Sequence, residues 1–320
     1  MTEFLMNRDK PSLYREDDGN VGRILFIFNP VSGKSQIRND LLDILQILSG
    51  TGYKLECYPT KCSGDARNLL RNREDDYVYV VCSGGDGTLD EVVSGMMENT
   101  RKPKVPIGYI PSGTTNDFAS SLGIPSDMRE AAGVIADGRT YECDLGRFNN
   151  EAYFTYVAAF GLFTETSYET PQDLKNQIGH AAYILQGMID LSKIRTYRFK
   201  VECDEMSITD QFVFGMITNS KSVGGFADIT GTEVDMSDGL FEVTLIKMPT
   251  NILELNDIVQ YLSRTVNVSD LVYQFKTRHI VLESDERVKW TRDGEFGGNC
   301  KRVELTNIQR AVRIIVPDKS

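Results

Sequence analysis

The stretch Tyr77–Met97, YVYVVCSGGDGTLDEVVSGMM, decides the fold because an apolar, β-rich run stops at a glycine-rich turn and resumes with helical spacing. We therefore predict a strand, a turn and a helix. Three glycines within Gly84–Gly87 allow positive φ angles and a close approach of the backbone to a ligand. Thr88 and Glu91 have capping-box spacing, which predicts a helix start whose free N–H groups face an anion.

Asp86 is unusual inside such an anion-binding turn. A carboxylate repels phosphate unless a metal ion, a ribose hydroxyl or a proton lies between them. The turn therefore indicates Mg-nucleotide chemistry. The alternative, a glycine-rich βα turn that binds no ligand, stays open for this motif alone.

The composition is typical of a globular protein, with 320 residues, 41% apolar and 25% charged, enough for two domains. The net charge of −11 argues against a nucleic-acid partner and against attraction of the whole protein to anionic membranes. Any membrane contact must then use a local patch. No apolar run is long enough to span a bilayer.

Cysteine and histidine usage narrows the chemistry further. The six cysteines lack CxxC spacing and no signal peptide precedes them, so we expect reduced thiols in the cytoplasm. The two histidines, His180 and His279, are far apart, which makes zinc chemistry improbable. Acid–base work then falls mainly to carboxylates, and a metal would be a hard cation such as Mg²⁺ or Ca²⁺.

The alternation of apolar run and polar turn occurs four times in the first part of the chain. Four βα units in succession predict a parallel sheet whose polar turns share one edge and converge on one crevice. The helix expected at Ala66–Asn72 is predicted to be capped by Ser63. The other strands are expected at Arg23–Phe28, Lys54–Tyr58 and Val105–Ile110.

From about Tyr141 the pattern changes to strand-like runs separated by polar turns, which predicts a second, mostly antiparallel domain. The expected limits are an extension at 1–20, an α/β domain at 21–143, a β-rich domain at 144–306 and a C-terminal segment at 307–320 that returns to either domain. Strands are expected at Tyr153–Phe160, Tyr197–Cys203, Gln211–Thr218, Leu240–Lys247, His279–Glu283 and Ala311–Val316, and helices at Gly179–Leu191 and Ile252–Leu262.

Five motifs occur in a fixed order: NPVSGK, GGDGT, PSGTTNDFA, a late GGF and a late DGE. With them, residues 22–318 resemble the diacylglycerol kinase catalytic-domain family, especially the soluble bacterial lipid kinases. GGDG is shared with NAD kinases and phosphofructokinases, whereas the NDFA element that follows it is specific to lipid kinases. The resemblance implies an NAD kinase-like α/β domain, a β-rich lipid-substrate domain and an active site in the cleft between them.

The resemblance also implies which residues contact ATP. Asp86 would engage ATP through Mg²⁺ and water, and Asp144 would join the magnesium network. Asn116 and Asp117 match the element that shapes the site, with helix capping as the alternative. The implied nucleotide contacts are Asn29, Gly33, Thr60, Gly84, Gly85, Asp86, Gly87, Thr88, Leu89, Asp90 and Thr114.

The turn Asp293-Gly294-Glu295 matches the family's DGE element. The implied catalytic residues are Glu295, Asp86 and Asp293, with Glu295 as the base that accepts the proton of the lipid hydroxyl. A hydroxyl that attacks the γ-phosphoryl group needs such an acceptor. The alternative is an exposed β-turn with an Asp-Gly tip.

Val234–Leu240 matches a family loop that binds a structural Mg²⁺. The implied ligands are the Asp238 carboxylate and the carbonyls of Asp235 and Leu240. Ser237 departs from the family's pair of aspartates, which predicts a weaker or water-completed site. Ser120 likewise replaces an arginine often found after NDFA.

The glycine-aromatic turns and a cluster of basic residues can each be interpreted in two ways. Phe160–Phe163 and Gly224–Phe226 are either core and turn elements or part of an acyl-chain entrance. The basic cluster is either a solvated face or a membrane-docking patch. It consists of Lys193, Arg195, Arg198 and Lys200.

Taken together, these patterns predict an ATP- and Mg²⁺-dependent lipid kinase of phospholipid metabolism, cytoplasmic and peripheral at the inner membrane face. Diacylglycerol is the default acceptor and phosphatidic acid the product. The alternatives are an NAD kinase-like phosphotransferase and a catalytically silent lipid- or nucleotide-binding protein. The sequence leaves open the acceptor lipid, its acyl chains and the oligomeric state, with a homodimer among the alternatives.

Overall fold

The computed structural model divides the chain into two compact units. The first contains the described residues up to Gly113, Gly123–Tyr141 and the chain from Arg313, and the second contains Thr114–Leu122 and Glu142–Val312. The residues described are 21–35, 37–101, 104–114, 116–162, 195–204, 206–223, 226–227, 234–262 and 269–318. The extension at 1–20, the helix expected at Gly179–Leu191 and Lys193 lie outside them.

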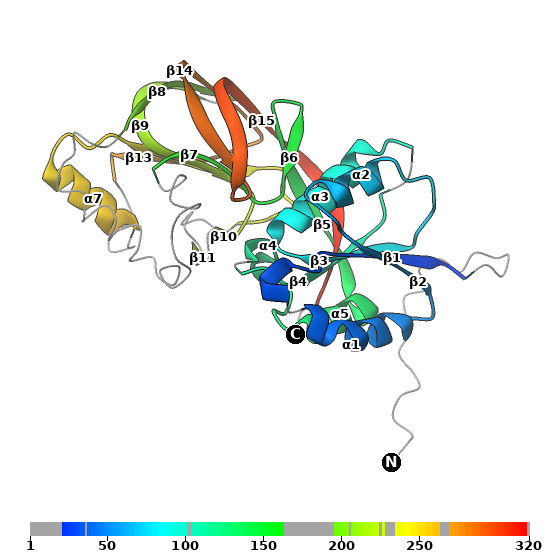
Figure 1. The fold of residues 1–320 in the computed structure, drawn as a ribbon. Coiled ribbons are helices and arrows are strands. Elements are labelled where there is room, and N and C mark those ends of the chain that lie inside the picture. The colour runs from blue at the N-terminus through cyan, green and yellow to red at the C-terminus, as the bar shows by residue number, and fades with distance from the viewer. Residues whose placement is uncertain are drawn as a thin grey trace. The chain divides into compact units, whose positions relative to one another are not determined.

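A parallel sheet forms the centre of the first unit (Figure 1), as the four βα units predict. Its order is β2-β1-β3-β4-β15, and the end of β15 joins through the pair Ile314 and Ile107. The four inner residues of β1 are buried, because a strand covered on both faces must be apolar throughout. The strands are β1 (Arg23–Phe28), β2 (Lys54–Pro59), β3 (Tyr79–Gly84), β4 (Ile107–Pro111) and β15 (Glu295–Val316).

Helices cover both faces of this sheet. In Figure 1, α1 (Ile37–Ser49) and α5 (Met128–Asp137) lie on one face. The other face carries α2 (Asp65–Arg71) and α3 (Asp86–Glu98), which pack against each other. The short 3-10 helix η1 (Ser32–Ser35) follows β1. The glycine-rich turn therefore lies between the buried strand β3 and the helix α3, as predicted.

The second unit is built on antiparallel pairs, as the second half of the sequence predicts. Its order is β13-β12-β9-β7-β14-β15, and β8 pairs with β14 and β9. Among its described residues, helices are found at α4 (Asp117–Ser121) and α7 (Ile252–Leu262). The strands are β5 (Arg139–Phe148), β6 (Ala152–Phe154), β7 (Val157–Gly161), β8 (Tyr197–Cys203), β9 (Met206–Thr218), β10 (Ser222–Val223), β11 (Phe226–Ala227), β12 (Phe241–Lys247), β13 (Val272–Thr277) and β14 (His279–Arg292).

Aromatic side chains fill the core of the second unit. The ring of Phe160 lies 4.9 Å from that of Trp290 and 4.5 Å from that of Phe199, all three fully buried. Leu162 packs against a smaller apolar cluster that includes Leu255 of α7. Phe160 is therefore a core residue and the partly buried Leu162 packs against the core, which favours the structural interpretation of their turn. Phe163, Gly224 and Gly225 lie outside the described residues.

Candidate active site

The polar turns of the first unit lie at one edge of its sheet. Backbone hydrogen bonds continue the sheet ladder past the strand ends and link each turn to the next strand. The turns that follow β2, β1, β3 and β4 are therefore neighbours, as expected at the carboxyl ends of parallel strands. These bonds run from Thr60 N to Phe28 O (2.9 Å), from Asn29 N to Ser83 O (2.9 Å) and from Ser112 N to Gly84 O (2.8 Å).

Three of these turns meet around Gly85. A Cβ atom on Gly85 would lie 3.4 Å from the Cα of Gly113 and 4.0 Å from the Oγ of Ser32. The Oγ of Ser32 also donates a hydrogen bond to the carbonyl of Ser112 (3.4 Å). The turns after β1, β3 and β4 therefore come close together at Gly85, and the space between them is about the size of the side chain that Gly85 lacks. This geometry suits a ligand that approaches backbone groups closely.

Helix α3 begins beside this gap. Gly85 is its N-cap residue, and no side chain caps it, so the predicted capping box at Thr88 is wrong. Thr88 packs instead against Gly84, where any Cβ would overlap its side chain. Asp86 is the first residue of the helix, and one of its carboxylate oxygens is buried. The N-terminus of α3 therefore faces the three turns with backbone groups and one acidic side chain.

Four other residues predicted to contact the nucleotide lie in or next to the same turns of the first unit. Asn29 accepts a hydrogen bond from Val31 N (3.0 Å), which fixes the first turn, and Gly33 adopts a positive φ of 52°. Leu89 is buried in the core, whereas Asp90 is half-buried on α3. Leu89 therefore packs in the core, and the other three of these residues remain candidates for contact with a nucleotide.

Glu91 has a role that the local sequence does not reveal. Its carboxylate accepts hydrogen bonds from the backbone N–H groups of Gly64 (2.6 Å) and Ala66 (3.2 Å). It therefore caps α2 from the neighbouring helix, and Ser63 makes no cap, contrary to prediction. Ser63 Oγ lies 3.5 Å from the same carboxylate. Glu91 ties α3 to the turn that follows Thr60.

The turn between β14 and β15 is held by a buried carboxylate. Asp293 and Gly294 have φ angles of 47° and 81°, as a two-residue type I′ hairpin requires. Burial raises the pKa of Asp293, and the hydrogen bonds that its carboxylate accepts act in the opposite direction. Glu295, at the start of β15, is exposed. The donors to Asp293 are Thr155 N (2.5 Å), Thr155 Oγ1 (2.8 Å), Val157 N (2.9 Å) and Tyr156 N (3.0 Å).

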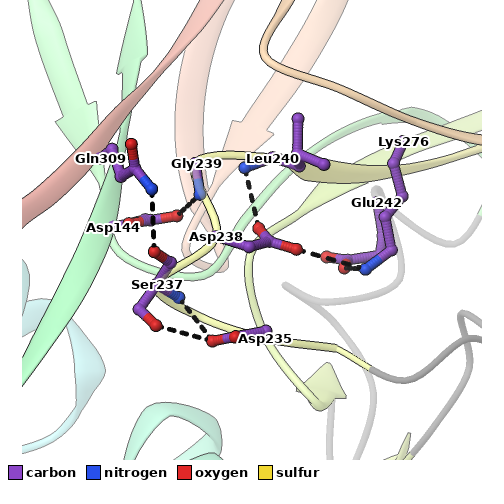
Figure 2. Close-up of polar contacts among 9 residues, drawn as sticks. All are labelled: Asp144, Asp235, Ser237, Asp238, Gly239, Leu240, Glu242, Lys276 and Gln309. Carbon is purple, nitrogen blue, oxygen red and sulfur yellow. Dashed lines mark hydrogen bonds and ion pairs between the residues drawn. The ribbon is translucent and has the colours of Figure 1, made fainter.

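Asp144 anchors the loop Val234–Leu240 in the second unit (Figure 2). Its carboxylate accepts hydrogen bonds from Gly239 N (2.6 Å), drawn in Figure 2, and from Arg310 N (2.7 Å). Asp144 is fully buried, and burial raises its pKa while these two donors act in the opposite direction. These two hydrogen bonds fix the loop against β5.

Asp238 lies at the centre of that loop. One carboxylate oxygen accepts a hydrogen bond from Leu240 N (2.9 Å), and the other lies 3.5 Å from the Nζ of Lys276. The same ammonium lies 3.0 Å from a carboxylate oxygen of Glu242. Burial raises the pKa of Glu242 to about 7, against the opposing effect of Lys276.

The loop Val234–Leu240 offers few ligands for a metal ion. Asp235 accepts hydrogen bonds from Ser237 N (3.0 Å) and Ser237 Oγ (2.7 Å). Within the described ranges, no group of three or more His, Cys, Asp or Glu side chains is placed to hold a metal ion. An ion here would therefore depend on Asp238, backbone carbonyls such as those of Asp235 and Leu240, and water.

Thr114–Leu122, a segment that includes α4, belongs to the second unit. Asn116 is at the N-cap position of α4 with a φ of 52°, but its side chain makes no capping hydrogen bond. Helix capping is therefore the wrong interpretation for this side chain. Asp117 is buried at the start of the helix, and Thr114 is exposed.

The described part of the basic cluster lies on exposed positions next to or within β8. Arg195 forms an ion pair with Glu286 (3.0 Å), and Lys200 forms one with Glu202 (2.6 Å). These pairs favour the solvated-face interpretation. No helix in the described ranges is long and apolar enough to cross a membrane.

Comparison with known proteins covers both units. Residues 23–148 match the diacylglycerol kinase catalytic domain, and residues 163–316 match the YegS C-terminal NAD kinase beta sandwich-like domain. A protein named diacylglycerol kinase from Bacillus subtilis is 32% identical over 301 residues, which is 92% of this chain and 96% of that protein. The chain belongs to the diacylglycerol kinase family.

A further relative agrees with this family assignment, and a solved structure agrees with the fold. A diacylglycerol kinase of Staphylococcus aureus (strain MRSA252) is 33% identical over 299 residues, with 92% of this chain and 93% of that protein covered. A crystal structure of a diacylglycerol kinase from Bacillus anthracis str. Sterne has the same fold, with a TM-score of 0.71 and 21% identity. It covers 92% of this chain and 97% of that one.

For this diacylglycerol kinase family member, the structure gathers the predicted residues into groups. Asn29, Thr60 and Gly84–Thr88 lie at one sheet edge of the first unit, and Leu89 and Asp90 follow on α3. Sequence reasoning missed Glu91 as the cap of α2 and the pairing of Lys276 with Asp238. The second unit contains Thr114, Asn116, Asp117, Asp144, Asp235, Asp238, Leu240, Asp293 and Glu295.

The cap of α2 gives a direct prediction. Glu91→Ala should lower the free energy of unfolding by about 1 kcal/mol, because it removes a carboxylate cap. The amides of Gly64 and Ala66 should exchange with solvent about fivefold faster, measured by hydrogen exchange.

Glu98→Ala is the matched control, since Glu98 also joins α3 to α2, through Arg67 Nε (2.9 Å), but at the other end of the helix. It should leave the exchange of the Gly64 and Ala66 amides unchanged. Equal exchange at these amides in Glu91→Ala and wild type would show that Glu91 is not the cap.

Proposed function

We propose that this protein is an ATP- and Mg²⁺-dependent lipid kinase that transfers the γ-phosphoryl group of ATP to the hydroxyl of diacylglycerol, yielding phosphatidic acid. Membership of the diacylglycerol kinase family supports the reaction class. The main structural support is the meeting of three strand-end turns at Gly85, beside the N-terminus of α3.

The first unit fits the phosphates of a nucleotide. The absent side chain of Gly85 leaves room beside the backbone of Gly113, and the positive end of the α3 dipole favours an anion. Asp86 in the first turn of α3 adds a negative charge that a triphosphate alone would meet unfavourably. Bound Mg²⁺ would supply the charge neutralisation that phosphoryl transfer needs.

Glu295 is the proposed proton acceptor for the lipid hydroxyl. It is exposed on a hairpin whose backbone is fixed by the four hydrogen bonds to Asp293. With its carboxylate so occupied, Asp293 acts as a positioning residue that orients Glu295 rather than as a second base. This division gives the base access to a substrate while holding its backbone still.

A lipid acceptor requires contact with a membrane surface. Phe296 follows Glu295 and is 61% exposed, so an apolar side chain lies next to the proposed base. We infer that this hairpin meets the lipid, with the protein peripheral at the cytoplasmic face of the membrane. Arg195 and Lys200 form ion pairs with glutamates of the protein, so we expect the basic cluster to contribute less to membrane docking than this hairpin.

The test of this function is an acceptor competition. The full chain is incubated with γ-labelled ATP, Mg²⁺ and detergent micelles that contain diacylglycerol and a sphingoid base, with NAD in the same mixture. We expect label in phosphatidic acid. Label only in NADP would favour the NAD kinase-like alternative, and absence of transfer to every acceptor would favour a silent binding protein.

Glu295→Gln should separate chemistry from binding. The amide keeps the shape of the side chain but loses its basicity, so kcat should fall by roughly 10² to 10⁴ while ATP affinity changes little. Lipid-dependent ATP turnover and nucleotide titration measure the two quantities.

Glu283→Gln, an exposed glutamate on β14, is the matched control and should leave kcat unchanged. A kcat near the wild-type value in Glu295→Gln would remove Glu295 from the chemistry. Retention of phosphatidic acid synthesis in that case would still leave the proposed reaction intact.

A further inference from the structure

Lys276 bridges two carboxylates in the second unit (Figure 2). Its ammonium lies 3.0 Å from Glu242 and 3.5 Å from the Oδ2 of Asp238. Glu242 and Lys276 face each other directly on the paired strands β12 and β13. The position of the ammonium is therefore set by strand register rather than by a flexible surface contact.

Glu242 makes this arrangement more than a surface ion pair. It is only 2% exposed, and its carboxylate lies 3.0 Å from the Lys276 ammonium. The Lys276 charge is thus the main compensation for a carboxylate removed from water. Lys276 is held where a cation is needed, next to the loop that contains Asp238.

The loop Val234–Leu240 is already closed by contacts within the protein. Asp238 accepts from Leu240 N (2.9 Å), Asp144 accepts from Gly239 N (2.6 Å), and Gln309 Nε2 donates to the carbonyl of Ser237 (3.2 Å). Ser237, which stands where the resemblance implies a second aspartate, donates its hydroxyl to Asp235 (2.7 Å). The loop therefore has one carboxylate fewer than the resemblance implies, and the Lys276 ammonium lies beside the carboxylate of Asp238.

We propose that Lys276 is a tethered cation for the Asp238 loop, so that the loop keeps its shape without a divalent ion, and any divalent ion there competes with the ammonium. Mg²⁺ binds a carboxylate oxygen at about 2.1 Å, and the Lys276 charge beside the same oxygen repels it. Such an ion would bind through residues of the second unit and would stabilise that unit. Its binding is therefore testable without nucleotide or lipid.

Lys276→Met tests the competition directly. The thermal midpoint Tm of the full chain is measured without nucleotide, in EDTA and in increasing MgCl₂. In wild type, Tm should be the same in EDTA and in submillimolar Mg²⁺. In Lys276→Met, Tm should fall in EDTA and recover as Mg²⁺ is added, with Mg²⁺ affinity about tenfold or more above wild type.

Lys247→Met is the matched control, because Lys247 lies on β12, pairs with Asp210 (3.6 Å) and is similarly half-buried. Its Tm should respond to Mg²⁺ as the wild type does. An equal Mg²⁺ response in Lys276→Met and wild type would overturn the proposal, as would a fall in wild-type Tm when EDTA is added.

Asp238→Asn provides a second test if Lys276→Met fails to fold. The amide oxygen still accepts from Leu240 N, and only the charge that faces Lys276 is lost. A tethered lysine predicts a lower Tm than wild type even in EDTA. An unchanged Tm in EDTA would show that Lys276 does not stabilise the loop.

Discussion

The register of the parallel strands β1, β3 and β4 is the constraint on which the candidate site depends. The ladder places Phe28 opposite Ser83 and Gly84 opposite Pro111, so the strands end at neighbouring points of one edge. Backbone hydrogen bonds then extend the ladder into the turns. A shift of one residue in any strand would exchange the side chains on its two buried faces and move its turn away from Gly85.

Carboxylates hold much of the remaining architecture in this acidic chain. Glu91, Asp144 and Asp293 each accept hydrogen bonds from backbone N–H groups of segments far away in the sequence. Such bonds to a charged acceptor are stronger than neutral ones and fix the position of a turn. Glu295 differs, because it is exposed beside one of these anchored residues. These four acidic residues thus divide into three that anchor backbone segments and one exposed group available for chemistry.

The local sequence pattern was enough to predict those strands and helices in which apolar residues recur at regular spacing. Tyr197–Cys203 and Ile252–Leu262 have the predicted limits because apolar residues recur in them at strand and helix spacing. The strand expected at His279–Glu283 extends to Arg292, since its exposed face is charged and resembles a loop in sequence. Its buried positions still alternate, which places Trp290 in the core.

The contacts that sequence did not reveal join residues far apart in the chain. Glu91 resembles a cap for its own helix, yet it caps a helix that begins 25 or more residues earlier. Asp293 and Thr155 are 138 residues apart, and Lys276 and Asp238 are 38 apart. Helix packing brings Glu91 to α2, and strand pairing brings the other two pairs together. Both follow from the whole fold rather than from any local motif.

Nucleotide affinity of Gly85→Ala tests the central claim most directly. The added methyl group would meet the Cα of Gly113 at 3.4 Å, an ordinary contact, and the backbone of Gly85 (φ −84°, ψ −175°) suits any residue. The fold should therefore persist while the room between the three turns is filled. We predict that Mg-ATP affinity, measured by titration, falls about tenfold or more, a loss of at least about 1.4 kcal/mol. Gly133→Ala, a helical position with open space around it, should bind as the wild type does. A folded Gly85→Ala protein with wild-type affinity would contradict nucleotide binding at these turns.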